Sequence, residues 1–250
     1  RALARGAPGR RGGPRVSALL EAHLRPIAAR WPSIAAAVRA AAPDRSLAFL
    51  ASTAGPPVPV LSGGRALHSK VDPVREARRV AAALPPCGVA VFLGLGGGYL
   101  PAAALARGSL FAAIVVERDA VALRALIEGA DLTALLADPR VSLVVGAGDV
   151  APAVLAAWSP GLMGDLAVVP LRPWCDAAPE FFARAAASVE AARSPAAADL
   201  AAQARFGGRW MVNALANLPA IERARLAIPP VERAIVTGAG PSLDLAAADL

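Results

Sequence analysis

Two glycine-rich segments are the parts of the sequence best suited to holding a ligand. The first reads FLGLGGGY, and Glu117 follows it at the end of the next apolar run. Glycines let a backbone turn sharply and approach a ligand closely, and an acidic residue after the second strand binds a ribose diol. Gly94, Gly96, Gly98 and Glu117 therefore form a possible ligand loop for a dinucleotide or S-adenosylmethionine. The alternative is that the glycines only pack a strand against a helix.

The second segment reads VTGAGPSLD and is typical of a phosphate loop. Gly238 and Gly240 expose successive N–H groups at the start of a helix, where anions are favoured. Pro241 lacks an N–H that the first helical turn would leave unpaired, and Ser242 adds a hydroxyl donor. A carboxylate repels a phosphate, so Asp244 either faces away or holds a metal ion or a sugar hydroxyl. A capped turn without a ligand is the alternative.

Other polar residues give weaker indications of a site. Asn213 and Asn217 are four residues apart, so they share one helical face and could bond the second loop, a ligand or each other. His68 lies in an HSK segment with no acidic residue placed to orient it, which favours a histidine satisfied within its loop. The two cysteines and two histidines lack a metal-ligand spacing, so the sequence predicts no metal site.

The hydrophobic pattern predicts the elements that position these residues. Short apolar runs alternate with Ala-rich helical segments, at 89–93, 112–116, 141–145 and 165–169. Runs that are apolar on both faces are typical of a parallel sheet covered by helices. Pro101 is expected to interrupt the helix that follows the first glycine segment.

The segments before this sheet predict a helix and a hairpin. Residues 16–42 have a helical pattern that is broken or kinked at Pro26 and Pro32. Residues 46–52 and 58–62 predict a β-hairpin. Asp72 and Pro73 then supply an N-cap and a first helical residue.

The segments after the sheet predict a second domain. Residues 177–218 are helical with a break at Ser194-Pro195, and a strand at 233–237 leads into the second glycine segment. One strand cannot bury both its faces, so this region is expected to be the truncated start of a second α/β domain. We therefore predict an α/β fold in three parts. These are a flexible basic tail (1–15), a helix, hairpin and Rossmann-like domain (16–200), and an incomplete second domain (201–250).

The net charge of +7 is concentrated near the N-terminus, where residues 1–40 hold eight arginines and one acidic residue. Nucleic-acid binders usually spread basic residues over a folded face with aromatic residues between them. A Gly/Pro/Arg tail instead indicates a solvated terminus. No apolar segment of a secretory signal follows it, and the uncharged stretch 80–106 is interrupted by prolines and glycines. We expect a cytoplasmic protein with neither nucleic acid nor a membrane as its partner.

Several segments resemble, in order, those of the motility-associated factor (Maf) proteins, a bacterial flagellin-glycosyltransferase family. LHSKVDPVREA at 67–77 resembles the family's LHSKYDPxxEA stretch, and GLGGGY at 94–99 resembles its GLGxGY loop. RWMVN at 209–213 and NLP at 217–219 are similar to the entry of its central domain. GAGPSLD at 238–244 matches a motif shared with the 6-hydroxymethylpterin diphosphokinase MptE-like domain.

The resemblance covers about residues 46–250, with Val71 where the family often has Tyr. It implies a fragment of an enzyme that transfers a nonulosonic (sialic-acid-like) sugar from a CMP-activated donor to Ser or Thr of flagellin. The nucleotide would be held by the second glycine segment with Asn213 and Asn217. Mg²⁺ is a possible participant, and the catalytic base is expected beyond Leu250.

Two other functions remain open. An MptE-like diphosphokinase would use ATP and Mg²⁺ and pass a diphosphate to a hydroxymethylpterin. In the other case the Rossmann-like domain is a non-catalytic module that binds flagellin or the sister domain, and its glycine loop serves packing alone.

Overall fold

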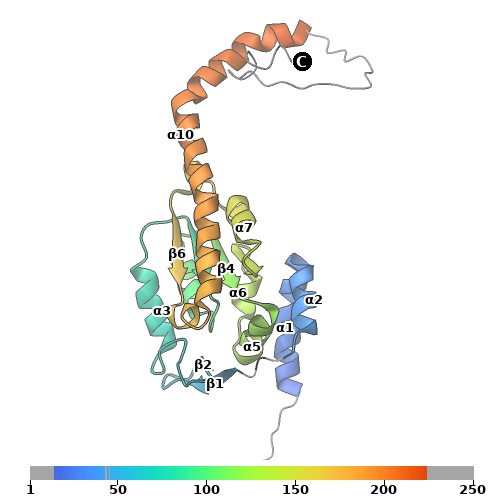
Figure 1. Cartoon of the computed structure of the whole chain (residues 1–250), viewed down its shortest axis with the longest axis vertical. Helices are drawn as coiled ribbons and strands as arrows, with labels where there is room; N and C mark the ends of the chain where they lie inside the picture. Colours follow the sequence, from blue (N-terminus) through green and yellow to red (C-terminus); the bar gives the residue numbers. More distant parts are fainter. Residues whose placement is uncertain (1–13, 43, 45, 224–250) are drawn as a thin grey trace, which may run out of the picture. The chain divides into compact units, whose positions relative to one another are not determined.

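The structure is a computed structural model that describes residues 14–42, 44 and 46–223 (Figure 1). The described part divides into two compact units between Ala202 and Gln203. The tail predicted at 1–15 lies outside the described residues except for its last two, which begin helix α1 (Pro14–Arg30). The strand predicted at 233–237 also lies outside them.

A four-stranded parallel sheet is the centre of the first unit and confirms the predicted α/β, Rossmann-like fold. Its strands lie in the order β5-β4-β3-β6, with bounds β3 (Val89–Leu93), β4 (Ala112–Glu117), β5 (Val141–Val145) and β6 (Leu166–Pro170). The chain proceeds from β3 outward to β4 and β5, and then returns to place β6 on the other side of β3. The strand order therefore reverses between β3 and β6. In open parallel sheets, ligands bind outside the carboxyl ends of the strands at such a reversal.

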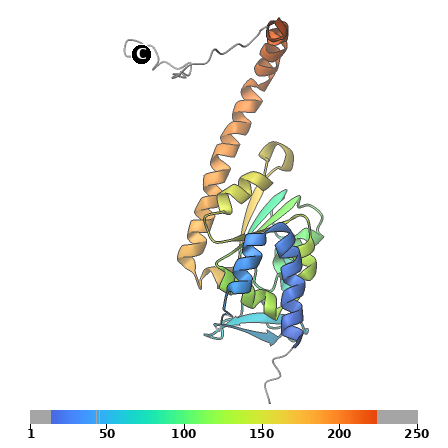
Figure 2. The ribbon, with the colours of Figure 1, turned by 90° about the vertical axis from the view of Figure 1, so that its right-hand side faces the viewer.

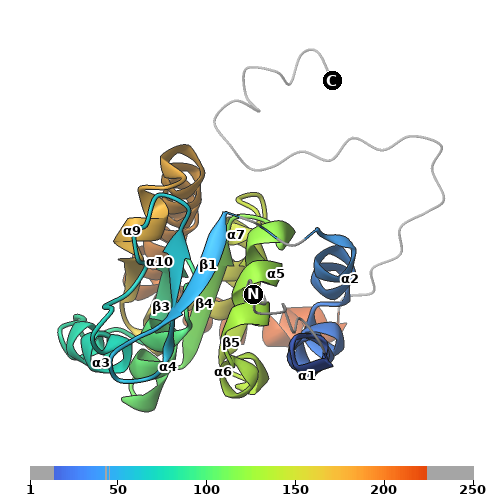
Figure 3. The same cartoon turned by 90° about the horizontal axis from the view of Figure 1, so that it is seen from below.

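Helices cover both faces of the sheet (Figure 3). One core contains Ala90 and Phe92, and the other contains Val89, Val91 and Leu93, so successive residues of β3 enter opposite cores. The first core is covered by α3 (Pro73–Ala82), α4 (Tyr99–Ala106), α5 (Ala120–Gly129) and α6 (Thr133–Ala137). The second is covered by α7 (Val150–Ala157), α8 (Pro160–Met163), α9 (Arg172–Cys175) and the start of α10 (Pro179–Arg223). Burial on both faces explains why every residue of β3 is apolar.

Helices α1 and α2 (Pro32–Ala40) pack against α5 on the outside of this arrangement (Figure 2). His23 of α1 is fully buried: its Nδ1–H donates to the Ile127 carbonyl at 2.8 Å, and its Nε2 accepts the Leu132 N–H at 2.8 Å. A ring that both donates and accepts is neutral. The predicted break falls before Pro32, whereas Pro26 lies inside α1.

Arg30, the last residue of α1, lies at the start of the edge strand β5. Its guanidinium donates to the carbonyls of Asp138 at 2.9 Å and Pro139 at 3.2 Å, and also to that of Val141. Three backbone acceptors at this corner of the sheet therefore share one cation.

The predicted hairpin is confirmed as β1 (Leu47–Ala51) paired antiparallel with β2 (Pro57–Leu61). The Tyr99 hydroxyl, just after the glycine segment that follows β3, donates to the Pro57 carbonyl at 2.5 Å. The hairpin therefore lies at the carboxyl end of β3. The predicted start of α3 is also confirmed, because the Asp72 carboxylate accepts the Arg75 N–H at 2.8 Å and Pro73 is the first helical residue.

Two expectations about prolines are wrong. Pro101 does not interrupt a helix, because it lies in the first turn of α4, where N–H groups have no intrahelical partner. Helix α10 runs through Ser194-Pro195 without a break. A proline removes one helical hydrogen bond, and here Val189 and Ala192 of the preceding turns are buried in the second core. No helix in the described ranges combines the length and the apolarity that a membrane crossing requires.

Candidate functional site

The glycine loop after β3 is filled by side chains of the same chain. Its residues 94–98 are all buried. Gly94, Gly96 and Gly98 have φ values of 101°, 54° and 73°, a region that favours glycine. A Cβ on these glycines would collide with Trp174, with His68 and with Leu132, respectively. The three glycines are therefore required by close packing within the fold.

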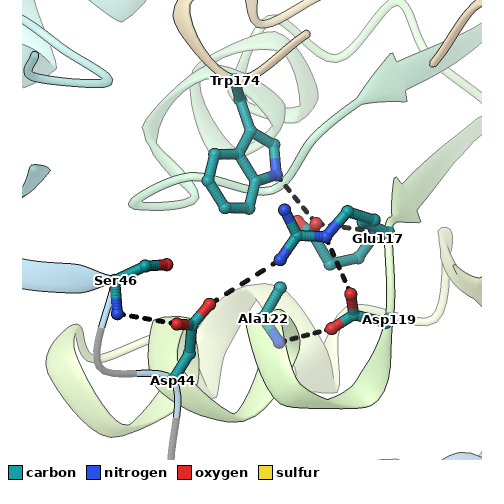
Figure 4. A network of polar contacts seen from close by, with 7 residues as sticks. Asp44, Ser46, Glu117, Asp119, Ala122 and Trp174 are labelled. Carbon is teal, nitrogen blue, oxygen red and sulfur yellow. Dashed lines mark hydrogen bonds and ion pairs between the residues drawn. The ribbon is translucent and has the colours of Figure 1, made fainter. Parts of the chain in front are cut away.

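Glu117 at the end of β4 is fully buried and bonded within the fold. Its Oε2 accepts the Leu95 N–H at 3.1 Å. Its Oε1 accepts the Arg118 N–H at 2.7 Å and the Trp174 indole N–H at 2.8 Å, and Figure 4 shows the Trp174 indole beside Glu117. Burial raises the pKa of Glu117, and these hydrogen bonds oppose that rise. The carboxylate that a ribose diol would need is thus engaged by three donors of the chain.

Arg118, the residue after Glu117, pairs with two acidic residues, Asp44 and Asp119. Its Nε donates to Asp119 at 2.7 Å, and its guanidinium lies 3.7 Å from Asp44 and 5.1 Å from the centre of the Trp174 ring. Asp119 also caps α5 by accepting the Ala122 N–H at 2.7 Å (Figure 4). Although burial alone would raise the pKa of Asp119, the Ala122 N–H and Arg118 lower it. These charges are therefore paired within the fold.

His68 fastens the other side of the loop. Its Nε2 accepts the Gly97 N–H at 2.8 Å, and its ring meets Tyr99 edge-on with centres 5.2 Å apart. Burial lowers the pKa of His68 to about 4, so the ring is neutral at neutral pH. Because Nε2 is an acceptor, the ring proton lies on Nδ1. The histidine is thus bonded through Nε2, and its partner is the glycine loop and not, as expected from the sequence, its own loop.

The residues after His68 hold it in place. The Ser69 hydroxyl oxygen accepts the N–H groups of Val71 at 3.2 Å and Asp72 at 3.3 Å, and the Ser69 N–H donates to Glu76 at 2.7 Å. With the Asp72 cap on α3, the polar side chains of this segment build a rigid turn. The segment therefore positions the imidazole against the loop.

Four N–H groups of the loop, those of Gly94, Leu95, Gly97 and Gly98, are bonded within the chain. Gly94 donates to the Val116 carbonyl at 2.9 Å and Gly98 to the Leu95 carbonyl at 2.9 Å, in addition to the bonds of Leu95 and Gly97 described above. A phosphate bound by the N–H of Gly97 or Leu95 would have to displace His68 or Glu117, respectively. Displacement would leave buried polar groups unpaired unless the ligand replaced each bond.

Sequence reasoning missed Trp174 and Leu171, which fill the loop from the turn after β6. No local pattern marks them. Of the other predicted residues, Asn213 and Asn217 are exposed on α10 in the second unit. Gly238, Gly240, Pro241, Ser242 and Asp244 lie outside the described residues. Within the described ranges, no three metal-ligating side chains gather into a cluster.

The first unit is thus an α/β protein of Rossmann-like architecture whose glycine loop is filled by its own side chains. No protein-family model matches the chain, and no curated protein matches it. Among solved structures it is similar to a Maf glycosyltransferase from Magnetospirillum magneticum AMB-1, with 16% identity, a TM-score of 0.45 and 69% of this chain covered. The match covers 35% of that protein, so this chain spans about a third of its length.

Proposed function

We propose that the chain is part of a cytoplasmic Maf-like glycosyltransferase that transfers a nonulosonic acid from a CMP-activated donor to Ser or Thr of flagellin. The ordered segments at 67–77, 94–99, 209–219 and 238–244 support this proposal. The observation that carries it is the hydrogen bond from the Gly97 N–H to His68 at 2.8 Å. Segments 67–77 and 94–99, which resemble two separate stretches of the family, are therefore in direct contact.

The two glycine loops then have different roles. In the first loop the N–H groups of Leu95 and Gly97 bind Glu117 and His68, so this loop has a structural role. The second loop is then the nucleotide loop. Its Gly238 and Gly240 would offer N–H groups to the CMP phosphate, with the Ser242 hydroxyl as a further donor.

Such a transfer requires stabilisation of the departing CMP phosphate and of an oxocarbenium-like sugar. Backbone N–H groups at Gly238 and Gly240 would stabilise the phosphate without adding a charge to be desolvated. Asp244 would hold Mg²⁺ or a sugar hydroxyl. The base that deprotonates the acceptor hydroxyl would come from residues beyond Leu250.

Calorimetric titration of the protein with CMP, ATP and S-adenosylmethionine tests this division. We expect CMP to bind preferentially. Preferential binding of ATP would indicate an MptE-like diphosphokinase instead. Binding of S-adenosylmethionine alone would indicate that the first glycine loop is the ligand site.

The Ser242→Ala variant tests the second loop itself. Loss of one hydrogen bond to a charged group should weaken CMP binding by about 1 kcal/mol. Ser188→Ala is the matched control, because the Ser188 hydroxyl forms an exposed hydrogen bond to the Arg184 carbonyl of its own helix. Equal CMP affinity in both variants would exclude Ser242 from the nucleotide site.

A second candidate function concerns the first unit alone. The collision of a Gly96 Cβ with His68 and Leu171 favours a non-catalytic module whose glycine loop serves packing. In that case substitutions in the loop reduce stability and leave the CMP affinity of the folded protein unchanged. A loop variant that folds normally but loses CMP binding would contradict it.

A further inference from the structure

A cavity of about 380 Å³ lies beside the filled glycine loop, where the strand order of the sheet reverses. We call it the switch-point cavity. Its walls are formed by segment 66–69, α3, Leu100 of α4 and the turn 170–173 at the carboxyl end of β6. Ligand pockets in proteins have volumes of roughly 300 to 1,000 Å³, and Rossmann-like sheets bind ligands at this reversal. The cavity therefore has the size and the location of a ligand site.

His68 presents an unused donor at this cavity. Its Nε2 accepts the Gly97 N–H, so Nδ1 carries the proton, and no described residue accepts that proton. His68 is only 9% exposed, yet among the described residues Ser52 Oγ is the one fully buried side-chain nitrogen or oxygen without a hydrogen-bond partner. The Nδ1–H therefore reaches open space, and His68 lines the cavity.

Two charged groups of opposite sign also line the cavity. Arg172 is exposed, and no acidic side chain of the described residues pairs with it. Glu76 uses Oε2 to accept the Ser69 N–H at 2.7 Å, and its Oε1 has no donor within the described part. The remaining wall is apolar and includes Leu67, Val80, Leu100 and Leu171.

We propose that the switch-point cavity binds a small zwitterion with an apolar body, the class of the free apolar α-amino acids. The ligand carboxylate accepts from the His68 Nδ1–H and the Arg172 guanidinium, and the ligand ammonium donates to Glu76 Oε1. The ligand side chain lies against Val80 and Leu100. One cation, one anion and one neutral donor on an apolar wall match this class better than they match a phosphate, because Glu76 would repel a dianion.

Titration of ¹⁵N-labelled protein with L-phenylalanine and L-leucine tests the proposal by NMR. We expect saturable shifts of the Gly97 amide resonance, which reports on His68, with a Kd of ~1 mM or below. 3-Phenylpropionate lacks the ammonium and phenethylamine lacks the carboxylate, so each should bind about tenfold more weakly than L-phenylalanine. No shift of the Gly97 amide with either amino acid would overturn the proposal, and equal binding of 3-phenylpropionate would overturn the zwitterion class.

The variant Arg172→Met keeps the length of the side chain and removes its charge. We expect it to weaken L-phenylalanine binding about tenfold, the effect of losing one charged contact. Arg184→Met removes another exposed arginine of the same unit, which does not line the cavity, and should leave the affinity unchanged. Equal affinities in the two variants would contradict the role of Arg172. The CMP titration measures the second glycine loop, so failure of one proposal is distinguishable from failure of the other.

Discussion

Gly96→Ala tests most directly whether the first glycine loop is filled by the chain itself. Gly96 has a φ of 54°, and an alanine in this region costs about 1–2 kcal/mol. The new Cβ would also collide with His68 Nε2 and lie 2.7 Å from Leu171 Cδ2. If His68 moves away, the buried Gly97 N–H loses its acceptor, at a cost of about 1–3 kcal/mol. The free energy of unfolding should therefore fall by about 2–5 kcal/mol.

Gly64→Ala is the matched control for backbone strain. Gly64 has a φ of 79°, but a Cβ added to it would have no atom of the surrounding fold within 4 Å. This variant should lose only about 1–2 kcal/mol. Urea unfolding followed by circular dichroism measures both variants against the parent protein. Equal losses in the two variants would refute the conclusion that His68 and Leu171 fill the loop.

Three further predictions concern the polar groups around the loop. The pKa of His68 is about 4 in the folded state against an ordinary value of 6.5, so the unfolded chain takes up a proton first as pH falls. The contribution of the neutral ring to the free energy of unfolding is therefore complete above pH 6.5 and falls by roughly 3 kcal/mol as pH falls toward 4. His68→Gln keeps an acceptor for the Gly97 N–H and removes the titrating group. Urea unfolding at pH 7 and 4.5 should therefore show a smaller decrease in unfolding free energy for this variant than for the parent protein, and an equal decrease would contradict the role of His68. Glu117→Gln places an amide NH₂ against a backbone or indole donor and should lower the free energy of unfolding by about 1.5–3 kcal/mol. The NMR resonance of the Trp174 indole N–H should also change. If neither the stability nor this resonance changed, the carboxylate would not be bonded there. Asp72→Ala should cost about 1 kcal/mol of unfolding free energy through loss of the α3 cap, and Asp72→Asn should retain most of it.

The sequence predicts those parts of the fold that depend on neighbouring residues. The apolar runs of the four strands and the Asp72 cap are local signals, and the structure confirms them. The glycine pattern also marks the correct loop, because positive φ values leave a recognisable spacing.

The contents of that loop could not be predicted from local signals. His68 lies 29 residues before Gly97, and Trp174 lies 57 residues after Glu117. The Trp174 contact follows from the strand order, which brings the turn after β6 beside β3. An identical glycine pattern would be found whether a nucleotide or an indole occupied the space.

The position of Arg30 has a consequence for association between sheets. β5 is an edge strand, and an exposed edge offers backbone groups to any other strand. At its first residue, however, the Val141 carbonyl already accepts from the Arg30 guanidinium, which is shared with Asp138 and Pro139. A strand that added to this edge would have to displace a cation held by three carbonyls. Arg30 thus protects the beginning of β5 from intermolecular pairing while it joins α1 to the sheet.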